Sequence, residues 1–245
     1  MRAFLAALQF LTVIPVCAPL HRRDFERAPL WFPLVGLVLG TLVALTDLAI
    51  ARLGFSPLLL SIVSIGLLTV LTGGLHLDGL ADTADGFLSA RPRERVLEIM
   101  HDSRIGTMGT LALIFVLAIK VAALAELAGA NRWKTLVFAP LAGRCLQVAV
   151  MGLLPYARPT GGLATAFVRH HRKTYAIWSG LCLLAAAVML FGGVSGAGRI
   201  VAILVVGALL SVWSFRRIGG FTGDTVGATS ETVEAVVLLF ACLGL

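Results

Sequence analysis

Three aspartates between residues 73 and 87 have the spacing expected of a site that binds metal ions or phosphate. Asp78, Asp82 and Asp85 lie at i, i+4 and i+7 in the stretch GGLHLDGLADTADGF. On a helix, which turns by about 100° per residue, these positions fall within one face of roughly 60°. Carboxylates so close together repel one another unless a cation is present, and Mg²⁺ prefers carboxylate, water and phosphate oxygens. The spacing therefore predicts a helix whose acidic face holds Mg²⁺, with a solvated acidic helix end as the alternative.

A glycine-rich turn at residues 101–110, HDSRIGTMGT, could contribute to the same chemistry. Arg104 precedes Gly106 where a helix is expected to begin. Free backbone N–H groups at a helix start attract anions, and a guanidinium adds a bidentate donor. We therefore predict that Arg104 and Gly106 bind phosphate. Glycines are common at the start of membrane helices, so a purely structural turn is the alternative.

A second glycine-rich turn lies at residues 218–234, IGGFTGDTVGATSETVE. Gly223 and Asp224 stand at another expected helix entrance, where the backbone can approach a ligand closely and the carboxylate can bind a metal or the substrate. We predict a binding role for both residues. Glu231 and Glu234 are explained as acids in the first turn of a helix, behind threonine and serine caps.

Three basic residues are further candidates. Arg158 follows Tyr156 in PYARPTGG and could bind phosphate, although a snorkelling pair at the membrane interface is the alternative. Arg144 and Lys120 lie within apolar segments. Ionisable groups at membrane depth are costly, so each is a functional-site hypothesis. Each is expected to face the bundle interior and to pair with an acid or a phosphate. Arg144 has no acid near it in the sequence, and it is a candidate for binding phosphate.

The elements that must position these residues are membrane helices. Hydrophobic residues make up 58% of the 245 residues, and the mean hydropathy is +0.95, which excludes an ordinary soluble protein. The net charge of +7 is spread over loops without interleaved aromatic residues, which argues against a nucleic-acid partner and for a lipid bilayer. We predict an all-α, polytopic membrane helix bundle that forms a single integral-membrane catalytic domain over residues 1–245.

About six or seven transmembrane helices are expected. The apolar run at residues 232–245 is too short to cross about 30 Å unless its helix begins near Asp224. Residues 3–17 are also too short, and predict a re-entrant or interfacial helix. Residues 91–101 predict a short amphipathic helix on the membrane surface. The clear spans are about residues 32–52, a segment from Pro57 to the acidic stretch, and about residues 108–128, 135–154, 175–192 and 199–215.

The basic residues predict the orientation of the chain. One set of loops carries 13 of them and the opposite set 4, and the richer set is expected in the cytoplasm. The candidate site then faces the cytoplasm from the cell inner membrane. The first set is Arg22, Arg23, Arg27, Arg91, Arg93, Arg95, Arg104, Arg158, Arg169, Arg172, Lys173, Arg216 and Arg217, and the second is Arg52, Arg132, Lys134 and Arg199.

The motifs also carry a family resemblance. In order and spacing, GGLHLDGLADTADGF, EIMHDSRIGTMG, the Arg144 segment, YAR at 156–158 and GGFTGDTVGA at 219–228 resemble the adenosylcobinamide-GDP ribazoletransferase (cobalamin-5′-phosphate synthase) family. The amino-terminal segments LTVIPV and FPLVG fit as well. One departure is PTGGLA after Tyr-Ala-Arg, where the family pattern has an acid and a Gly-Leu-Gly turn.

The resemblance implies a bacterial inner-membrane, Mg²⁺-dependent transferase of late cobalamin biosynthesis. It would join adenosylcobinamide-GDP to α-ribazole 5′-phosphate, or to α-ribazole, with release of GMP, and could associate with other cobalamin-assembly enzymes. Asp78, Asp82 and Asp85, together with Asp224, would then hold Mg²⁺ on the diphosphate. The arginines Arg104, Arg144 and Arg158 would neutralise phosphate, and one carboxylate could act as general base.

Two other classes of protein would also account for acids on membrane helices. Membrane lipid phosphotransferases and prenyltransferases carry aspartate clusters, but their spacing differs from the one found here. A secondary transporter would use glycine-broken helices and charges near the bilayer midplane. Here the acids and glycines gather at helix ends, which favours a site open to soluble nucleotides.

Overall fold

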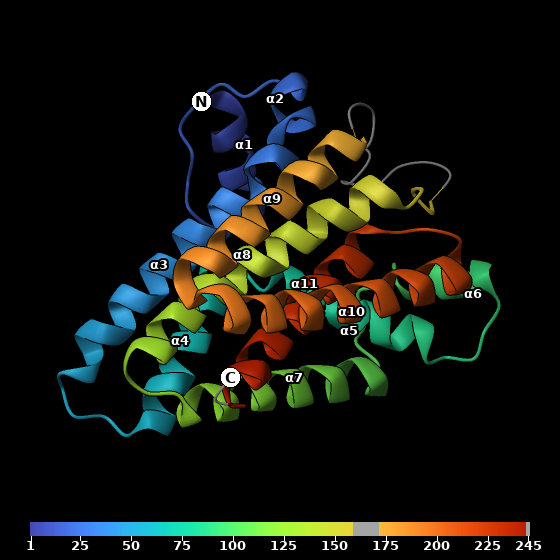
Figure 1. The fold of residues 1–245 in the computed structure, drawn as a ribbon. Coiled ribbons are helices and arrows are strands. Elements are labelled where there is room, and N and C mark those ends of the chain that lie inside the picture. Colours follow the sequence, from blue (N-terminus) through green and yellow to red (C-terminus); the bar gives the residue numbers. More distant parts are fainter. Residues whose placement is uncertain (159–171, 244–245) are drawn as a thin grey trace.

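The structure, a computed structural model, describes residues 1–158 and 172–243, and over these ranges the secondary structure is helical apart from one isolated β-bridge (Figure 1). The predicted all-α class is thus confirmed. Arg169 and the turn at residues 159–162 lie outside the described residues.

The helices follow one another along the chain in this order: α1 (Arg2–Leu11), α2 (Arg22–Glu26), η1 (Ala28–Trp31), α3 (Phe32–Ala51), α4 (Pro57–Leu71), α5 (Leu75–Phe87), α6 (Arg93–Ile99), α7 (Thr107–Glu126), α8 (Gly129–Leu153), α9 (Arg172–Phe191), α10 (Gly193–Ile218) and α11 (Gly223–Ala241).

Five helical segments of the described chain are long and apolar enough to cross a membrane, namely Ala28–Ala51 (η1 and α3), α7, α8, α9 and α10. The pair α4 and α5 makes a sixth if the two together form one broken span. On α7, α9 and α10 most of the apolar surface faces outward, as expected for helices that contact lipid. These helices confirm the predicted polytopic membrane bundle.

The acidic stretch forms a separate helix, which differs from the predicted continuation of the second span. The helix α4 ends at Leu71, and α5 leaves it at an angle of 90°. Gly73 and Gly74 make this turn with φ angles of +61° and +69°, in the left-handed region that side chains with a Cβ atom avoid. The helix α5, which carries Asp78, Asp82 and Asp85, is therefore not part of the five spans and runs at 90° to α4.

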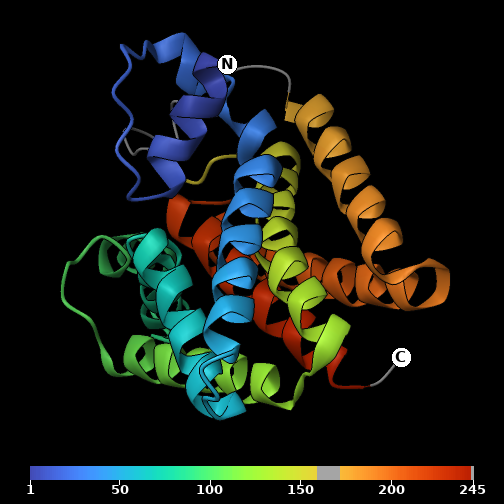
Figure 2. The same ribbon diagram turned by 90° about the vertical axis from the view of Figure 1, so that its left-hand side faces the viewer.

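The helix α8 is the centre of the bundle, with nearly all of its span buried. It packs against α3, α9 and α11, and Figure 2 shows α3 and α8 running side by side. Gly36 and Gly40 of α3 allow this contact, because a Cβ atom on either would lie 2.6 Å from a backbone oxygen of α8. Small residues spaced by four let membrane helices approach closely.

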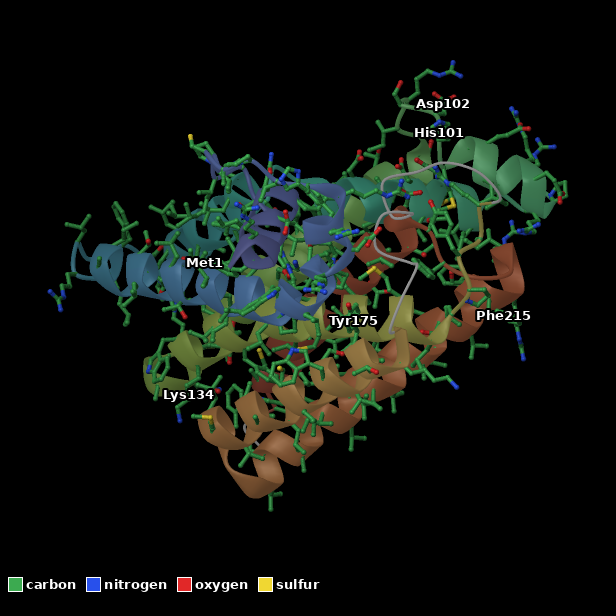
Figure 3. All side chains as sticks on the ribbon, turned by 90° about the horizontal axis from the view of Figure 1, so that it is seen from above. Met1, His101, Asp102, Lys134, Tyr175 and Phe215 are labelled. Carbon is green, nitrogen blue, oxygen red and sulfur yellow. The ribbon has the colours of Figure 1, made fainter. Side chains whose placement is uncertain are left out.

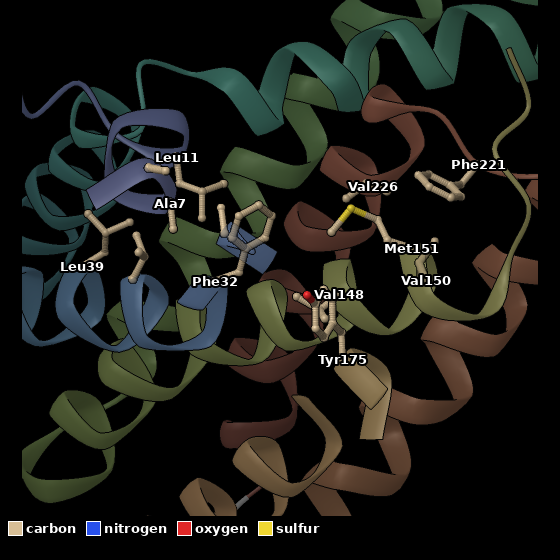
Figure 4. Packing of buried hydrophobic residues seen from close by; sticks show 13 residues of the cluster. Ala7, Leu11, Phe32, Leu39, Val148, Val150, Met151, Tyr175, Phe221 and Val226 are labelled. Carbon is tan, nitrogen blue, oxygen red and sulfur yellow. The ribbon is translucent and has the colours of Figure 1, made fainter. Parts of the chain in front are cut away.

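The helix α1 covers one end of the bundle. It has ten residues, too few to span a membrane, and lies with α2 at one end of α3 (Figure 1). Its buried residues Ala7 and Leu11 belong to a hydrophobic cluster with Phe32 of α3, Met151 of α8 and Val226 of α11 (Figure 4). This packing joins the amino-terminal helix to the ends of two central helices.

The carboxy-terminal helix α11 begins at Gly223, as the length argument required, but it is not among the five spans. It carries three acids, and most of its residues are buried inside the bundle. It contacts α5, α7, α8 and α10. The predicted possible seventh span is therefore a helix surrounded by protein.

Candidate active site

A cavity of about 980 Å³ lies where α5, α8 and α11 meet, closed on one side by α1 and on another by the loop after α6. Figure 3 shows His101 and Asp102 of that loop at the periphery of the molecule. The volume is at the upper end of the range for small-molecule sites. Its polar lining residues include His76, Asp78, Asp82, His101, Asp102, Gln147, Tyr156, Arg158 and Asp224, and its apolar ones include Phe10, Leu11, Phe32, Leu113, Met151 and Val226.

Three aspartates form one side of this cavity, which we call the carboxylate wall: Asp78 and Asp82 from α5, and Asp224 from the first turn of α11. Close contact between the two helices brings them together. A Cβ atom on Gly79 would lie 2.8 Å from the carbonyl oxygen of Asp224, so only glycine permits this approach. The structure thus brings together Gly79 and Asp224, which belong to two motifs far apart in the sequence.

The carboxylate wall is short of positive charge. Burial, followed by the negative charges of Asp224, Asp78 and Asp85, raises the pKa of Asp82 to about 7 against the opposing effect of Arg158. Burial also raises the pKa of Asp224, again opposed by Arg158. A cation bound at the wall would offset both effects by stabilising the ionised carboxylates.

Arg158 provides the direct ion pair to the wall, because its Nη2 atom donates to Asp224 Oδ2 over 2.8 Å. Its loop is held by the β-bridge between Tyr156 and Phe221, with backbone hydrogen bonds of 2.9 Å. The Arg93 side chain of α6 donates to the carbonyl oxygens of Ala157 (2.9 Å) and Ile218 (2.6 Å). Arg93, which the sequence did not single out, thereby ties the Arg158 loop to the end of α10.

The glycine turn before α7 binds a carboxylate of the protein itself. The N–H groups of Gly106 and Gly109 donate to the two oxygens of Asp85 over 2.7 and 2.8 Å. Asp85 therefore points at the start of α7, and unlike Asp78 and Asp82 it is not among the described residues that line the cavity. The amides predicted to bind phosphate are satisfied because a carboxylate caps this helix start.

Arg104 also lies apart from the cavity lining. Its side chain is exposed and forms an ion pair with Asp102, with 2.7 Å between Nη2 and Oδ2. Asp102 itself lines the outer edge of the cavity. The structure therefore does not join Arg104 to Arg158 and the carboxylate wall.

Arg144, predicted to bind phosphate, is instead part of a buried charge cluster. Its side chain is 1% exposed, forms an ion pair with Glu234 and donates to Ser230 Oγ over 3.1 Å. Lys120 donates to Glu231 and Glu234 over 2.5 and 2.6 Å. Glu231 and Glu234, predicted as first-turn acids behind threonine and serine caps, instead lie about two to three turns into α11. Their charges are buried there, so they require these basic partners.

The carboxylate wall offers oxygens of the kind that Mg²⁺ prefers, and it differs from the predicted set of three α5 aspartates in one member. Among the described residues, no group of three His, Cys, Asp or Glu side chains is arranged to hold a metal ion. Mg²⁺ usually needs only one or two protein carboxylates, with water and substrate phosphate as its other ligands. Asp78, Asp82 and Asp224 offer such oxygens, and their mutual repulsion calls for a cation, whereas Asp85 is occupied by amides.

Two lining residues were missed by the sequence reasoning. His76 lies within the acidic motif and Gln147 within an apolar span, and both are buried with an unpartnered polar atom. Gln147 could have been found from the sequence, because it is a lone amide in a membrane helix, where an uncompensated polar group is costly.

The fold and the site together define an integral membrane protein of helices whose acidic cavity suits a phosphorylated substrate and a divalent cation. A family model described as cobalamin-5-phosphate synthase matches residues 3–242. The chain therefore belongs to the cobalamin-5-phosphate synthase family.

Curated relatives agree with this family. The adenosylcobinamide-GDP ribazoletransferase of Desulforamulus reducens is 39% identical over 97% of this chain and 95% of its own length. That of Chlorobaculum tepidum is 42% identical (98% and 94%), and that of Escherichia coli K12 is 40% identical (97% and 98%). No solved structure matches the chain. The protein is thus a transferase of cobalamin biosynthesis, as the resemblance implied, and neither a lipid phosphotransferase nor a transporter.

Proposed function

We propose that the cavity is the active site of an adenosylcobinamide-GDP ribazoletransferase, which joins adenosylcobinamide-GDP to α-ribazole 5′-phosphate, or to α-ribazole, and releases GMP. The observation that carries the proposal is the convergence of Asp78, Asp82, Asp224 and Arg158 on one cavity. These are the side chains that a diphosphate and its counter-ion need.

The reaction exchanges one phosphoester partner for another. A ribose hydroxyl oxygen of α-ribazole 5′-phosphate attacks the phosphorus linked to cobinamide, and the bond from that phosphorus to the oxygen bridging it to GMP breaks. The hydroxyl proton passes to a base, for which a carboxylate of the wall is in place. Such reactions depend mainly on positioning and on stabilising charge on the phosphate oxygens.

The side chains around the cavity divide this work. When bound, Mg²⁺ would neutralise charge on the diphosphate oxygens. One or two of the carboxylates Asp78, Asp82 and Asp224 would hold it. Arg158 would neutralise phosphate beside the wall, fixed in place by its pair with Asp224 and by the Arg93 contacts of its loop. Asp85 would support the site indirectly, by fixing the start of α7.

The proposed enzyme is one catalytic domain in the cell inner membrane, with its cavity facing the cytoplasm. Two basic residues of the poorer loop set are buried: Arg132 in an ion pair with Asp47 at 2.7 Å, and Arg199 against aromatic rings. Of that set only Arg52, just after α3, and Lys134, near the start of α8, are then not buried, which strengthens the bias toward the cavity side. Soluble nucleotides reach that side directly.

The test is product formation by the detergent-purified full chain. Given both substrates and Mg²⁺, the protein should release GMP and form a cobalamin product, and EDTA should abolish both. Added Mg²⁺ in excess over EDTA should restore the rate. Folded protein that releases no GMP would refute the proposal, and turnover unaffected by EDTA would refute the metal.

A further inference from the structure

The buried end of the cavity carries two polar side chains that the carboxylate wall does not account for. His76 is 3% exposed and Gln147 is 1% exposed, and both line the cavity. Neither His76 Nδ1 nor Gln147 Oε1 has a hydrogen-bond partner within the described ranges. A buried polar atom left unpaired is costly, so such atoms in a binding cavity indicate a group that the ligand supplies.

The cavity has a charged mouth and an uncharged floor. At the mouth, Asp78 is exposed, and Asp82 and Asp224 are partly exposed. Around the floor, Gln147 is accompanied by apolar lining residues, with Met151 one turn further along α8. Such a floor suits a flat, uncharged ring with a hydrogen-bonding edge, and it disfavours phosphate.

The size of the cavity decides which part of the substrate enters. At about 980 Å³ it holds one ligand of about drug size, and not the corrin macrocycle with its side chains together with the nucleotide. Because the floor suits a flat ring, the nucleotide or the ribazole occupies the cavity and the corrinoid stays outside. This step rests on the proposed function.

We propose that Gln147, assisted by His76, recognises the guanine base of the substrate at the floor of the cavity. An amide side chain offers one donor and one acceptor, which match the adjacent N–H donors and carbonyl oxygen on the edge of guanine. The benzimidazole of α-ribazole carries no N–H group on its outer edge. The diphosphate then extends from the floor to the carboxylate wall, and the corrinoid remains at the mouth.

The first test compares nucleotides on the unaltered protein. Labelled GMP and AMP are titrated in equilibrium dialysis with the detergent-purified full chain, with Mg²⁺ present. GMP should bind at least about tenfold more tightly, because AMP lacks the matching edge. Equal binding of the two nucleotides would overturn the inference. This measurement does not depend on turnover, so it separates the inference from the proposed function, which fails if no cobalamin product forms.

The second test uses Gln147→Met, which keeps the shape of the side chain and removes its hydrogen bonds. The KM for adenosylcobinamide-GDP and the Kd for GMP should each rise about tenfold, and the preference over AMP should shrink accordingly. The KM for α-ribazole 5′-phosphate should change by less than about twofold. A rise confined to α-ribazole 5′-phosphate would place that substrate on the floor and overturn the inference.

The matched control is Thr135→Val, which also replaces a buried polar group of α8. Thr135 donates to its own helix at Asn131 and does not line the cavity in the described structure. Its GMP affinity should equal that of the unaltered protein, and an equal loss in both variants would overturn the inference. Gln147→Leu, which also removes both hydrogen-bonding atoms, replaces Gln147→Met if that variant does not fold, and it too must weaken GMP relative to AMP.

Discussion

The charges on α11 form two groups about two turns apart, and the two are balanced in opposite ways. Glu231 and Glu234 pair with Lys120 and Arg144 inside the bundle, so that two acids meet two bases. At the start of the same helix, Asp224 belongs to a wall of three carboxylates that Arg158 alone opposes with a direct ion pair in the described structure. Buried charge must be neutralised within the protein, whereas an imbalance persists only where solution can supply the missing charge.

The largest expected effect is on catalysis, from Asp82→Asn at the carboxylate wall. Removing the charge should lower kcat at least about 100-fold, because a carboxylate that holds the metal acts in the transition state. The melting temperature in detergent should not fall, since the change relieves repulsion. Glu98→Gln on α6, an exposed acid paired with Arg95, is the matched control and should retain the normal rate. A near-normal rate in Asp82→Asn would place the metal elsewhere.

The next effect is on stability, from Arg144→Met in the buried charge cluster. Leaving Glu234 with one fewer partner should cost about 3–5 kcal/mol of unfolding free energy, because an uncompensated buried charge remains. Thermal unfolding in detergent measures this cost. If the variant folds normally but binds nucleotide poorly, Arg144 contacts the substrate and the distinction between the two groups is lost.

A smaller effect is expected from Asp85→Ala. Loss of the two hydrogen bonds from Gly106 and Gly109 should destabilise the start of α7 by about 1–2 kcal/mol, as for other helix caps. The Mg²⁺ concentration that gives half the maximal rate should stay the same. A marked increase in that concentration would return Asp85 to the metal ligands, as its spacing in the sequence predicts.

The smallest effect is expected from Arg104→Ala, because exposed ion pairs contribute little. The KM for adenosylcobinamide-GDP should change by less than about twofold, with no change in melting temperature. Arg158→Ala is the contrast, and should raise the same KM by about tenfold or more through the loss of a charged hydrogen bond. Equal effects in the two variants would contradict the separation of Arg104 from the cavity.

The helices were largely predictable because they depend on local sequence. Apolar runs located α3, α7, α8, α9 and α10, and the length argument placed the start of α11 near Asp224. The 90° turn between α4 and α5 was not foreseen, although Gly73 and Gly74 marked it, because two glycines do not specify a direction.

The candidate site was predictable only in part. The residue types and their order pointed to Asp78, Asp82, Arg158 and Asp224, which the structure gathers around one cavity. The sequence did not show that Arg144 pairs with Glu234, because the two residues are 90 positions apart and each was interpreted only from the residues next to it. Periodicity likewise placed Asp85 on the face of the other two aspartates but gave no sign of the amides that occupy it.

Because α11 follows α5, α7 and α8 in the chain, it is synthesised after the helices with which its acids interact. Until residue 224 has been made, the carboxylate wall lacks Asp224, and Lys120 and Arg144 have neither Glu231 nor Glu234 as a partner. A growing chain therefore holds unpaired membrane charges and no active site. Both defects are removed by one event, the arrival of α11, so that assembly of the bundle and gain of activity occur together.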